Sequence, residues 1–445
     1  MKAAVISALS SGQGKTLFTM ALLQWLKENV GSVRPFKVGP DYIDPRFHEK
    51  ITGVASVNLD LYMMSEVEVK NAFSYYTKDF DCTVVEGVMG LYDGLDYGTS
   101  TYEVAKAINI PTILIISAEG SYATLVPVLR GILDYKPNNT VQGVILNKVS
   151  SEKHYETVAK QINSEIPNLK ILGWIQKGLD IITSRHLGLD LTELENEKFS
   201  EIANKVMEHI NITELMDFME LKLSITSEKD CFMRNIEKHK KTIAVVNDRA
   251  FSFVYKQNLD FFDKFFEKVY RISALNNDEI PQDADVVYIP GGYVETPDVA
   301  YILDKADKFK SSLKAFSENP KKKIYAECAG FMFLGEKIQT TDGNWINGAG
   351  ILPVDFEIQK KRNRLGYYKA IDKDDLMLYK GHAFHYSCPT NIEEEAIVKW
   401  GLFKDKDSQA SVGAWTNEKR NVLGTYLHTL FYNQPELVLK YFIGE

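Results

Sequence analysis

A Gly/Ser-rich segment near the N-terminus has the residues needed to hold a phosphate group. It reads SSGQGKT over residues 10–16, between an apolar strand pattern and an amphipathic helical pattern. In such a loop Gly12 and Gly14 let the backbone turn its N–H groups towards the phosphates, at the positive end of the following helix. Lys15 reaches the β- and γ-phosphates, and Thr16 is placed to ligate Mg²⁺. The segment therefore predicts an ATP site.

This loop departs from the common phosphate-binding pattern at its first positions. Leu9 stands where GxxxxGK[ST] has its first glycine, and Ser10 stands where some ATPases carry a second lysine. We therefore assign it to a deviant class of phosphate loop. A turn that binds no ligand is the alternative, and the agreement of strand, loop and helix weighs against it.

Acidic residues follow two other predicted strands. Glu86 closes a short apolar run, and Asp41 and Asp44 lie in the segment KVGPDYIDP. Because the carboxyl ends of parallel strands meet at one edge of a sheet, we expect these carboxylates to converge beside the phosphate loop. Thr16, Asp41 and Glu86 are predicted to hold Mg²⁺, with Asp44 as the alternative to Asp41. Asn147 ends a further strand and is predicted to contact the nucleotide base, with helix capping as the alternative.

A second candidate site is centred on a cysteine. The segment KIYAECAGFM, residues 323–332, reads as a strand, a sharp turn and a helix, with Cys328 at the corner. This position at the positive end of a helix predicts a lowered pKa and a sulfur exposed as a nucleophile. The alternative is a buried cysteine that acts as a small hydrophobic residue.

Two further patterns favour the nucleophile. Gly292, in IPGGY, closes a preceding strand and can supply a backbone donor for an oxyanion. His428, in GTYLH, follows a strand-like run 100 residues after the cysteine and is the candidate base. His382 and His385, in GHAFHY, are rivals for that role.

The elements that position these residues form two α/β patterns. In the first, strand and helix patterns alternate as in a doubly wound parallel sheet, with strands over residues 3–9, 82–86, 112–117 and 141–146 and helices over residues 17–26, 102–108 and 125–133. An acidic helical stretch over 193–223 follows. The second pattern has strands over residues 242–246, 286–289 and 323–326 and hairpins over 341–400. We predict domains over residues 1–225 and 242–445, joined by a polar linker over 226–241.

Composition excludes several classes of protein. The 445 residues are 45% hydrophobic and 25% charged, with a net charge of −8, so no broad basic surface for nucleic acid or an anionic membrane is expected. No apolar run approaches the roughly 20 residues that cross a bilayer, and the N-terminus lacks a signal-peptide pattern. We therefore expect a cytoplasmic protein. The four cysteines contain no CxxC pair, which argues against a disulfide framework and a zinc site.

The chain resembles the cobyrinate a,c-diamide synthases over nearly its whole length. The most specific segments are PFKVGPDYIDPRFH, residues 35–48, and VEGVMGLYDG, residues 85–94. The phosphate loop, the PGGY segment and the cysteine corner also match. The resemblance implies an N-terminal domain similar to dethiobiotin synthetase, which binds ATP and a tetrapyrrole, and a C-terminal class I glutamine amidotransferase domain.

The resemblance also implies roles for single residues. Cys328 attacks glutamine and releases ammonia, with His428 as its base, and Gly292 and Ala329 donate N–H groups to the oxyanion. In the other domain Tyr42, Asp44 and Asp93 lie on the substrate side.

The implied reaction is ATP-dependent amidation of the a and c side-chain carboxylates of cobyrinate, through an acyl phosphate, in cobalamin biosynthesis. Glutamine or ammonia supplies the nitrogen, and Mg²⁺ accompanies ATP. One alternative is the same chemistry on Ni-sirohydrochlorin. Another is a deviant P-loop ATPase switch with a vestigial amidotransferase domain, which the missing lysine at Ser10 disfavours. The order of the two amidations and the oligomeric state stay open, a homodimer being one option.

The sequence departs from the family pattern near the cysteine site. Class I amidotransferases usually have a glutamate two residues after the histidine, where this chain has Leu430, so the partner that orients His428 is not identified. Ala329 stands where glycine is commoner, and Ala383 replaces the glutamate of the family's GHEFH segment.

Overall fold

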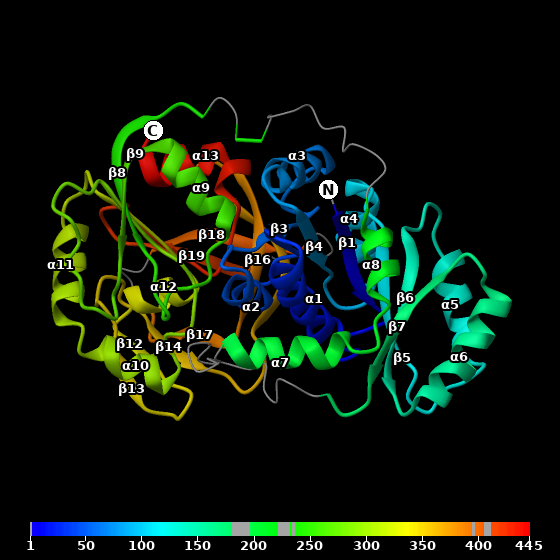
Figure 1. Ribbon diagram of the computed structural model, residues 1–445. Coiled ribbons are helices and arrows are strands. Elements are labelled where there is room, and N and C mark those ends of the chain that lie inside the picture. Colours follow the sequence, from blue (N-terminus) through cyan, green and yellow to red (C-terminus); the bar gives the residue numbers. More distant parts are fainter. Residues whose placement is uncertain (1, 180–195, 221–231, 234–235, 394–396, 405–410) are drawn as a thin grey trace. The chain divides into compact units, whose positions relative to one another are not determined.

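The computed structural model describes residues 2–179, 196–220, 232–233, 236–393, 397–404 and 411–445. Two compact units divide the chain at residue 234, and each has a large sheet (Figure 1). Strand β8 begins at His239, so residues 239–241, assigned to the linker by the sequence, belong to the sheet of the second unit. Cys231 and residues 226–230 of the predicted linker lie outside the described residues.

The first unit has a seven-stranded sheet in the order β3-β2-β4-β1-β5-β6-β7, with every pair parallel. The predicted doubly wound parallel sheet is confirmed. Its strands are β1 (Lys2–Ala8), β2 (Val33–Val38), β3 (Val57–Leu59), β4 (Cys82–Glu86), β5 (Thr112–Ser117), β6 (Val141–Val149) and β7 (Lys170–Gln176). Its helices are α1 (Lys15–Asn29), α2 (Ile43–Thr52), α3 (Glu66–Thr77), α4 (Thr101–Ile108), α5 (Leu125–Asp134), α6 (Glu152–Glu165), α7 (Asn196–Met207) and α8 (Ile212–Met219), with a 3₁₀ turn over Leu95–Tyr97.

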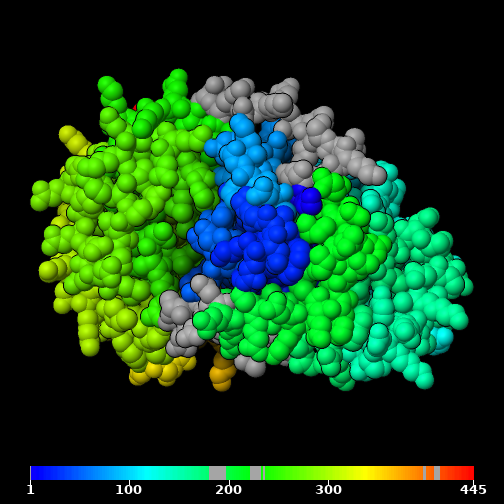
Figure 2. Space-filling model, viewed as in Figure 1, coloured from blue at the N-terminus to red at the C-terminus, as the bar shows by residue number. Residues whose placement is uncertain are grey.

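The acidic stretch predicted as one helical segment forms two helices. Helix α7 ends at Met207, and Asn211 caps α8 by accepting a hydrogen bond from the Glu214 N–H at 3.1 Å. Between them Ile210 pairs with Gly173 of β7, which interrupts the helix. Figure 2 shows the green atoms of α7 and α8 against the blue atoms of α1, in agreement with the apolar cluster that α1, α7 and α8 share.

The sequence explains where helices α3 and α4 begin and why strand β4 is buried. Helices α3 and α4 begin with capping boxes, Ser65 with Glu68 and Ser100 with Glu103, which satisfy two backbone donors at each start. Strand β4 is buried along its whole length, as expected when helices cover both faces of a parallel sheet.

The second unit has a nine-stranded sheet in the order β16-β15-β18-β19-β20-β11-β10-β8-β9. Strands β9, β8, β10, β11 and β20 pair in parallel, and the strands from β20 to β16 pair antiparallel, as the predicted hairpins require. A smaller sheet has the order β13-β12-β14-β17.

The strands of the second unit are β8 (His239–Val246), β9 (Phe266–Ile272), β10 (Val286–Ile289), β11 (Lys323–Glu327), β12 (Lys337–Gln339), β13 (Trp345–Asn347), β14 (Asp355–Ile358), β15 (Arg364–Asp372), β16 (Leu378–His385), β17 (Ser387–Thr390), β18 (Ile397–Phe403), β19 (Ser411–Thr416) and β20 (Val422–Thr425). The helices are α9 (Lys256–Phe265), α10 (Pro297–Asp304), α11 (Asp307–Ser317), α12 (Ala329–Leu334) and α13 (Pro435–Val438), followed by a π-helical turn over Leu439–Ile443. A 3₁₀ turn spans Phe431–Asn433.

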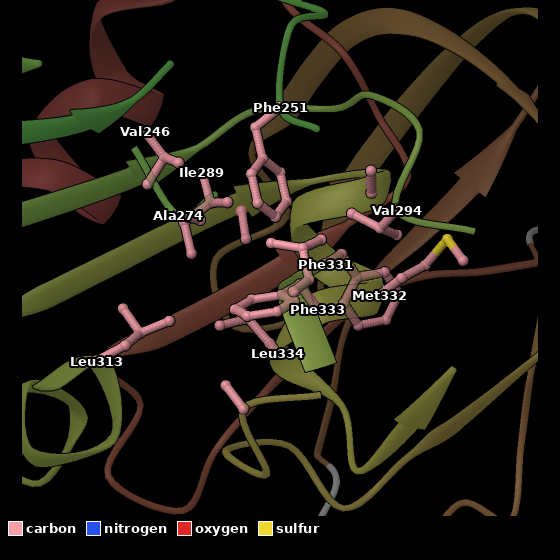
Figure 3. Packing of buried hydrophobic residues seen from close by; sticks show 14 of the residues in the cluster. Val246, Phe251, Ala274, Ile289, Val294, Leu313, Phe331, Met332, Phe333 and Leu334 are labelled. Carbon is pink, nitrogen blue, oxygen red and sulfur yellow. The ribbon is translucent and has the colours of Figure 1, made fainter. Parts of the chain in front are cut away.

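The core of the second unit surrounds the short helix α12. All six of its residues are buried, and Phe331, Phe333 and Leu334 pack among side chains from β8, β10 and α11 (Figure 3). Each such side chain contributes roughly 1.5–3 kcal/mol when it leaves water. This packing holds the corner between β11 and α12, where Cys328 lies. Among the described residues, no helix combines the length and hydropathy needed to cross a membrane.

Candidate functional site

The loop between β1 and α1 has the geometry of an anion site. Gly12 and Gly14 both have left-handed backbones, with φ of 81° and 95°. Gly14 is the N-cap of α1 and supplies no side-chain cap, so the N–H groups of the first turn face outward for a ligand. A Cβ at Gly14 would lie 2.1 Å from Nδ2 of Asn147, so only glycine fits.

Asn147 fixes this loop from the end of β6. Its Nδ2 donates to the carbonyl oxygen of Gln13 at 2.8 Å, and its Oδ1 accepts the N–H of Lys148 at 2.7 Å. Asn147 thus contacts the phosphate loop directly. Its contact with the nucleotide base stays a prediction.

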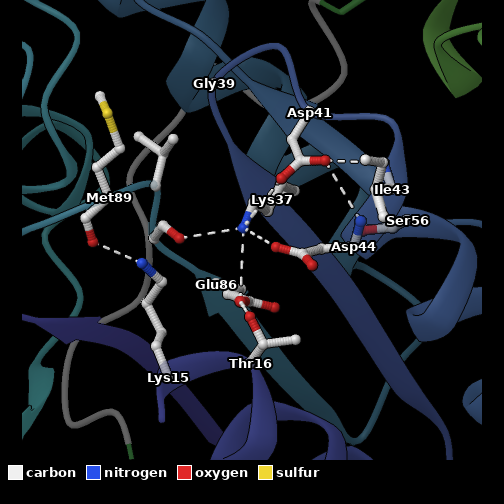
Figure 4. Close-up of polar contacts among 12 residues, drawn as sticks. Lys15, Thr16, Lys37, Gly39, Asp41, Ile43, Asp44, Ser56, Glu86 and Met89 are labelled. Atoms are coloured by element: carbon white, nitrogen blue, oxygen red, sulfur yellow. Dashed lines mark hydrogen bonds and ion pairs between the residues drawn. The ribbon is translucent and has the colours of Figure 1, made fainter. Parts of the chain in front are cut away.

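A second loop, residues 87–94, packs against the phosphate loop. Lys15 Nζ donates to the carbonyl oxygen of Met89 at 2.6 Å (Figure 4). Gly90 approaches Leu9 so closely that a Cβ would lie 2.3 Å from the Leu9 carbonyl oxygen. Asp93, predicted on the substrate side, accepts the Gly90 N–H at 2.7 Å and so closes this loop.

Three carboxylates converge on one buried lysine at the edge of the sheet. Lys37 Nζ lies 2.5 Å from Asp44, 3.4 Å from Asp41 and 3.5 Å from Glu86 (Figure 4). The Thr16 hydroxyl donates to the other side of this cluster, with 2.6 Å between its Oγ1 and Oε1 of Glu86. Thus the structure brings the predicted Thr16, Asp41 and Glu86 together, with Lys37 among them.

The charges of the cluster are unequal. Burial and the neighbouring Glu86 raise the pKa of Asp44 to about 7. Burial also opposes ionisation of Glu86, but the Lys37 ammonium and His48 outweigh it and hold the pKa of Glu86 well below its usual range. Asp44 is therefore the carboxyl group whose protonation changes near neutral pH. Tyr42, predicted on the substrate side, is the buried N-cap residue of α2.

The cysteine lies at a strained corner of the second unit. Cys328 has a φ of 46° between β11 and α12, and its N–H donates to the Thr425 carbonyl oxygen at 2.7 Å. Left-handed backbone at a non-glycine residue is typical of a nucleophile held on a sharp strand-to-helix turn. The corner predicted from the sequence is therefore present.

The expected lowering of the thiol pKa was wrong. Burial raises the pKa of Cys328, and the charges of Glu295 and Glu327 raise it further. The Ala329 N–H hydrogen-bonds to the cysteine and lowers the pKa, but α12 has only six residues and its effect is smaller than that of burial. Cys328 therefore needs a base to become a thiolate.

His428 is the histidine placed for that role. Its Nδ1 lies 3.1 Å from Oε2 of Glu327, which also accepts the Tyr288 hydroxyl at 2.9 Å. A Cβ built on Gly291 would lie 2.4 Å from Cε1 of His428 and 3.3 Å from Cβ of Cys328. The imidazole of His428 and the side chain of Cys328 therefore both lie next to Gly291. Glu327 is the residue that contacts the imidazole on its other side.

The two rival histidines make contacts of their own beside the candidate base. His385 stacks on Tyr426 with ring centroids 3.6 Å apart, and burial lowers the pKa of His385 to about 3. His382 pairs with His428 through backbone hydrogen bonds of 2.8 and 2.9 Å. The ring centroids of His382 and His428 lie 6.3 Å apart.

Of the predicted oxyanion donors, Ala329 already points its N–H at Cys328. Gly292 lies against Ala250, where a Cβ would be 1.9 Å from the Ala250 carbonyl oxygen, so glycine is required there. Their roles towards a bound oxyanion stay predictions.

Comparison with known proteins covers both units. Residues 242–436 match a CobB/CobQ-like glutamine amidotransferase domain, and residues 2–182 match an AAA domain. Cobyrinate a,c-diamide synthases from Fusobacterium nucleatum, Saccharolobus solfataricus and Limosilactobacillus reuteri are each 34% identical to the chain. The alignments cover 99%, 97% and 99% of this chain and 100%, 98% and 98% of the relatives. The chain belongs to the cobyrinate a,c-diamide synthase family.

Sequence reasoning missed three residues of the site in this member of the synthase family. Glu327 directly precedes the cysteine, and its position at the end of β11 was a usable signal. Lys37 and His48 both lie in the segment PFKVGPDYIDPRFH, but only its acidic and tyrosine residues were assigned roles. Their importance follows from tertiary contacts with Glu86, which the sequence does not display.

Proposed function

We propose that the protein is a cobyrinate a,c-diamide synthase, a ligase that uses ATP and glutamine or ammonia to amidate two side-chain carboxylates of cobyrinate. The observation that carries this proposal is the match of three synthases over 97–99% of the chain. The names of these relatives favour cobyrinate over Ni-sirohydrochlorin. The arrangement of Glu327, His428 and Cys328 disfavours an ATPase switch with a vestigial second domain.

In the second unit, Cys328 transfers its proton to His428 and attacks the carboxamide carbon of glutamine. The N–H groups of Gly292 and Ala329 donate hydrogen bonds to the carbonyl oxygen and stabilise the negative charge that develops on it. His428 then returns the proton to the leaving nitrogen, which departs as ammonia, and a γ-glutamyl thioester remains. Water cleaves the thioester to glutamate and restores the thiol.

In the first unit, a substrate carboxylate attacks the γ-phosphorus of ATP, and ADP leaves. Ammonia then displaces phosphate from the acyl phosphate and forms the amide. The backbone at Gly12 and Gly14 and the Lys15 ammonium bind the phosphates, and Asn147 holds the loop beside the base. Tyr42, Asp44 and Asp93 face the carboxylate substrate.

The oxygen groups around Glu86 suit Mg²⁺, which prefers oxygen ligands. Thr16, Asp41 and Glu86 would hold the ion, since the Thr16 hydroxyl and the Glu86 carboxylate are only 2.6 Å apart. When bound, Mg²⁺ neutralises charge on the phosphates. The Lys37 ammonium group lies beside Asp41, Asp44 and Glu86 and balances part of their negative charge.

The test is to incubate the protein with ATP, Mg²⁺ and glutamine and with either cobyrinate or Ni-sirohydrochlorin, and to count added amides by mass spectrometry. Two amides on cobyrinate are expected. Amidation of Ni-sirohydrochlorin alone would move the assignment to the other tetrapyrrole, and ATP hydrolysis with no amidation of either would contradict a synthase.

A further inference from the structure

His48 of α2 is a buried histidine to which the proposed mechanism gives no role. It has no exposed surface, and both ring nitrogens face polar groups. Nε2 lies 2.7 Å from Oε2 of Glu86, and Nδ1 lies 3.1 Å from the Ser56 hydroxyl. A ring that carries a proton on Nε2 donates a hydrogen bond from this atom to Glu86.

The contacts of Glu86 extend this arrangement to the phosphate loop. Its Oε2 faces His48, and its Oε1 accepts the Thr16 hydroxyl at 2.6 Å. Ser56, His48, Glu86 and Thr16 thus form one continuous chain of hydrogen bonds. The chain runs from the start of β3 to the first turn of α1, and Glu86 and His48 are both fully buried.

A purely structural role explains this arrangement poorly. An apolar side chain could fill the space between α2 and β4 without the cost of burying a polar ring. It would remove the donor that the described structure gives to Oε2 of Glu86, and a buried carboxylate without its donor is strongly unfavourable. A histidine at this position therefore fixes the orientation of one particular carboxylate.

We propose that His48 is a positioning residue for the magnesium–nucleotide site. By holding Oε2 of Glu86, it keeps Oε1 turned towards Thr16, so that both oxygen ligands are oriented before the ion arrives. His48 touches neither nucleotide nor ion. The inference rests on the proposed assignment of Thr16 and Glu86 as ligands. Partners of this kind, which hold a metal ligand from behind, typically change metal affinity 10–100-fold when removed.

The test uses two variants of matched polarity. His48→Gln places an amide N–H where Nε2 stood and keeps the contact with Glu86. His48→Asn keeps the contact with Ser56 and does not reach Glu86. Binding of Mn²⁺ to the full-length protein in the presence of a non-hydrolysable ATP analogue is followed by electron paramagnetic resonance. The apparent Mg²⁺ constant of ammonia-dependent amidation and the melting temperature are measured in parallel.

We expect His48→Asn to weaken Mn²⁺ binding about 10–100-fold and to raise the Mg²⁺ constant in proportion, and His48→Gln to retain most of the affinity. Glutamine hydrolysis at Cys328 should be unchanged in both. Equal Mn²⁺ affinity in His48→Asn and the parent protein would overturn the proposal, as would equal weakening in both variants.

Further variants separate the two proposals and guard against misfolding. If Thr16→Ala and Glu86→Gln bind Mn²⁺ as tightly as the parent, the ligand assignment itself is wrong. If they bind weakly and His48→Asn does not, only the role of His48 is wrong. Should His48→Asn lose its folded transition, Ser56→Ala takes its place, because it removes one hydroxyl and loosens the same ring. Parent-like affinity in that protein would then count against the proposal.

Discussion

Glu327 and His428 meet in the second unit although 101 residues separate them, with Nδ1 of the imidazole 3.1 Å from Oε2 of the carboxylate. Glu327 directly precedes Cys328, so the end of β11 supplies both the proposed nucleophile and the carboxylate that contacts its proposed base. In this chain the position two residues after the histidine is Leu430, which is buried and apolar. The orienting carboxylate therefore comes from a different strand than the family pattern of class I amidotransferases suggests.

This relationship makes Glu327→Gln an informative variant. Loss of the negative charge leaves the imidazolium of His428 without its stabilising partner, so glutamine-dependent turnover should fall about 10²–10⁴-fold. Ammonia-dependent amidation should persist. The control is Tyr288→Phe, which removes a neutral donor from the same carboxylate and should cost much less. Full glutaminase activity in Glu327→Gln would show that another group orients the base.

The division of labour between the units can be tested with one variant in each. Cys328→Ala should abolish amidation with glutamine but keep it with ammonia, because the alanine cannot form the thioester. Lys15→Ala should abolish amidation with either nitrogen source, because it removes the charge that we propose to bind the phosphates. Both are measured as amides formed per protein with each donor. Glutamate release by Cys328→Ala would show that the nucleophile is misassigned.

Gly291→Ala tests the space shared by the cysteine and the base. The added methyl would lie 2.4 Å from Cε1 of His428, which must move, so glutamine hydrolysis should be lost while ammonia-dependent synthesis remains. Gly131→Ala is a matched control in the first unit. In the part of the chain that the structure describes, nothing apart from the backbone of α5 itself lies within 4 Å of the new methyl, and the Gly131→Ala protein should be more stable by about 0.5–1 kcal/mol. A fully active Gly291→Ala protein would contradict the geometry of the site.

Glu295 should control the reactivity of the thiol with pH. Burial raises the pKa of Glu295 to about 7, so this carboxyl becomes charged as the pH rises through neutrality. Its charge in turn helps to raise the pKa of Cys328, after burial. Glu295→Gln should therefore lower the thiol pKa, and alkylation by iodoacetamide above neutral pH should be faster than in the parent. Below neutral pH, where the parent carboxyl is protonated, the two rates should converge.

Short sequence patterns were enough to predict which candidate site residues lie at the ends of strands. The phosphate loop, the turn at Cys328 and the alternation of the first unit are all encoded over short stretches, because glycine placement and apolar runs determine them. The pKa of Cys328 could not be predicted in this way. Its direction depends on how deeply the corner is buried, and that follows from packing around α12.

Lys37 illustrates the same limit in the first unit. A lysine inside a strand pattern is ordinarily expected to be solvated, yet its side chain is 2% exposed and surrounded by three carboxylates. Those partners come from β4 and from the segment after β2, and only the folded sheet brings them together. Sequence reasoning found the acidic residues and missed the cation that they surround.

Strand β1 lies between β4 and β5 at the centre of the first unit's sheet. During translation, the two hydrogen-bonding edges of β1 stay open until residues 82–117 have been made, because β1 pairs with β4 and β5. An extended apolar segment with two open edges is prone to aggregate in that interval. The nascent chain is thus expected to need protection by a chaperone until residue 117 has emerged, and truncations before residue 117 should be insoluble.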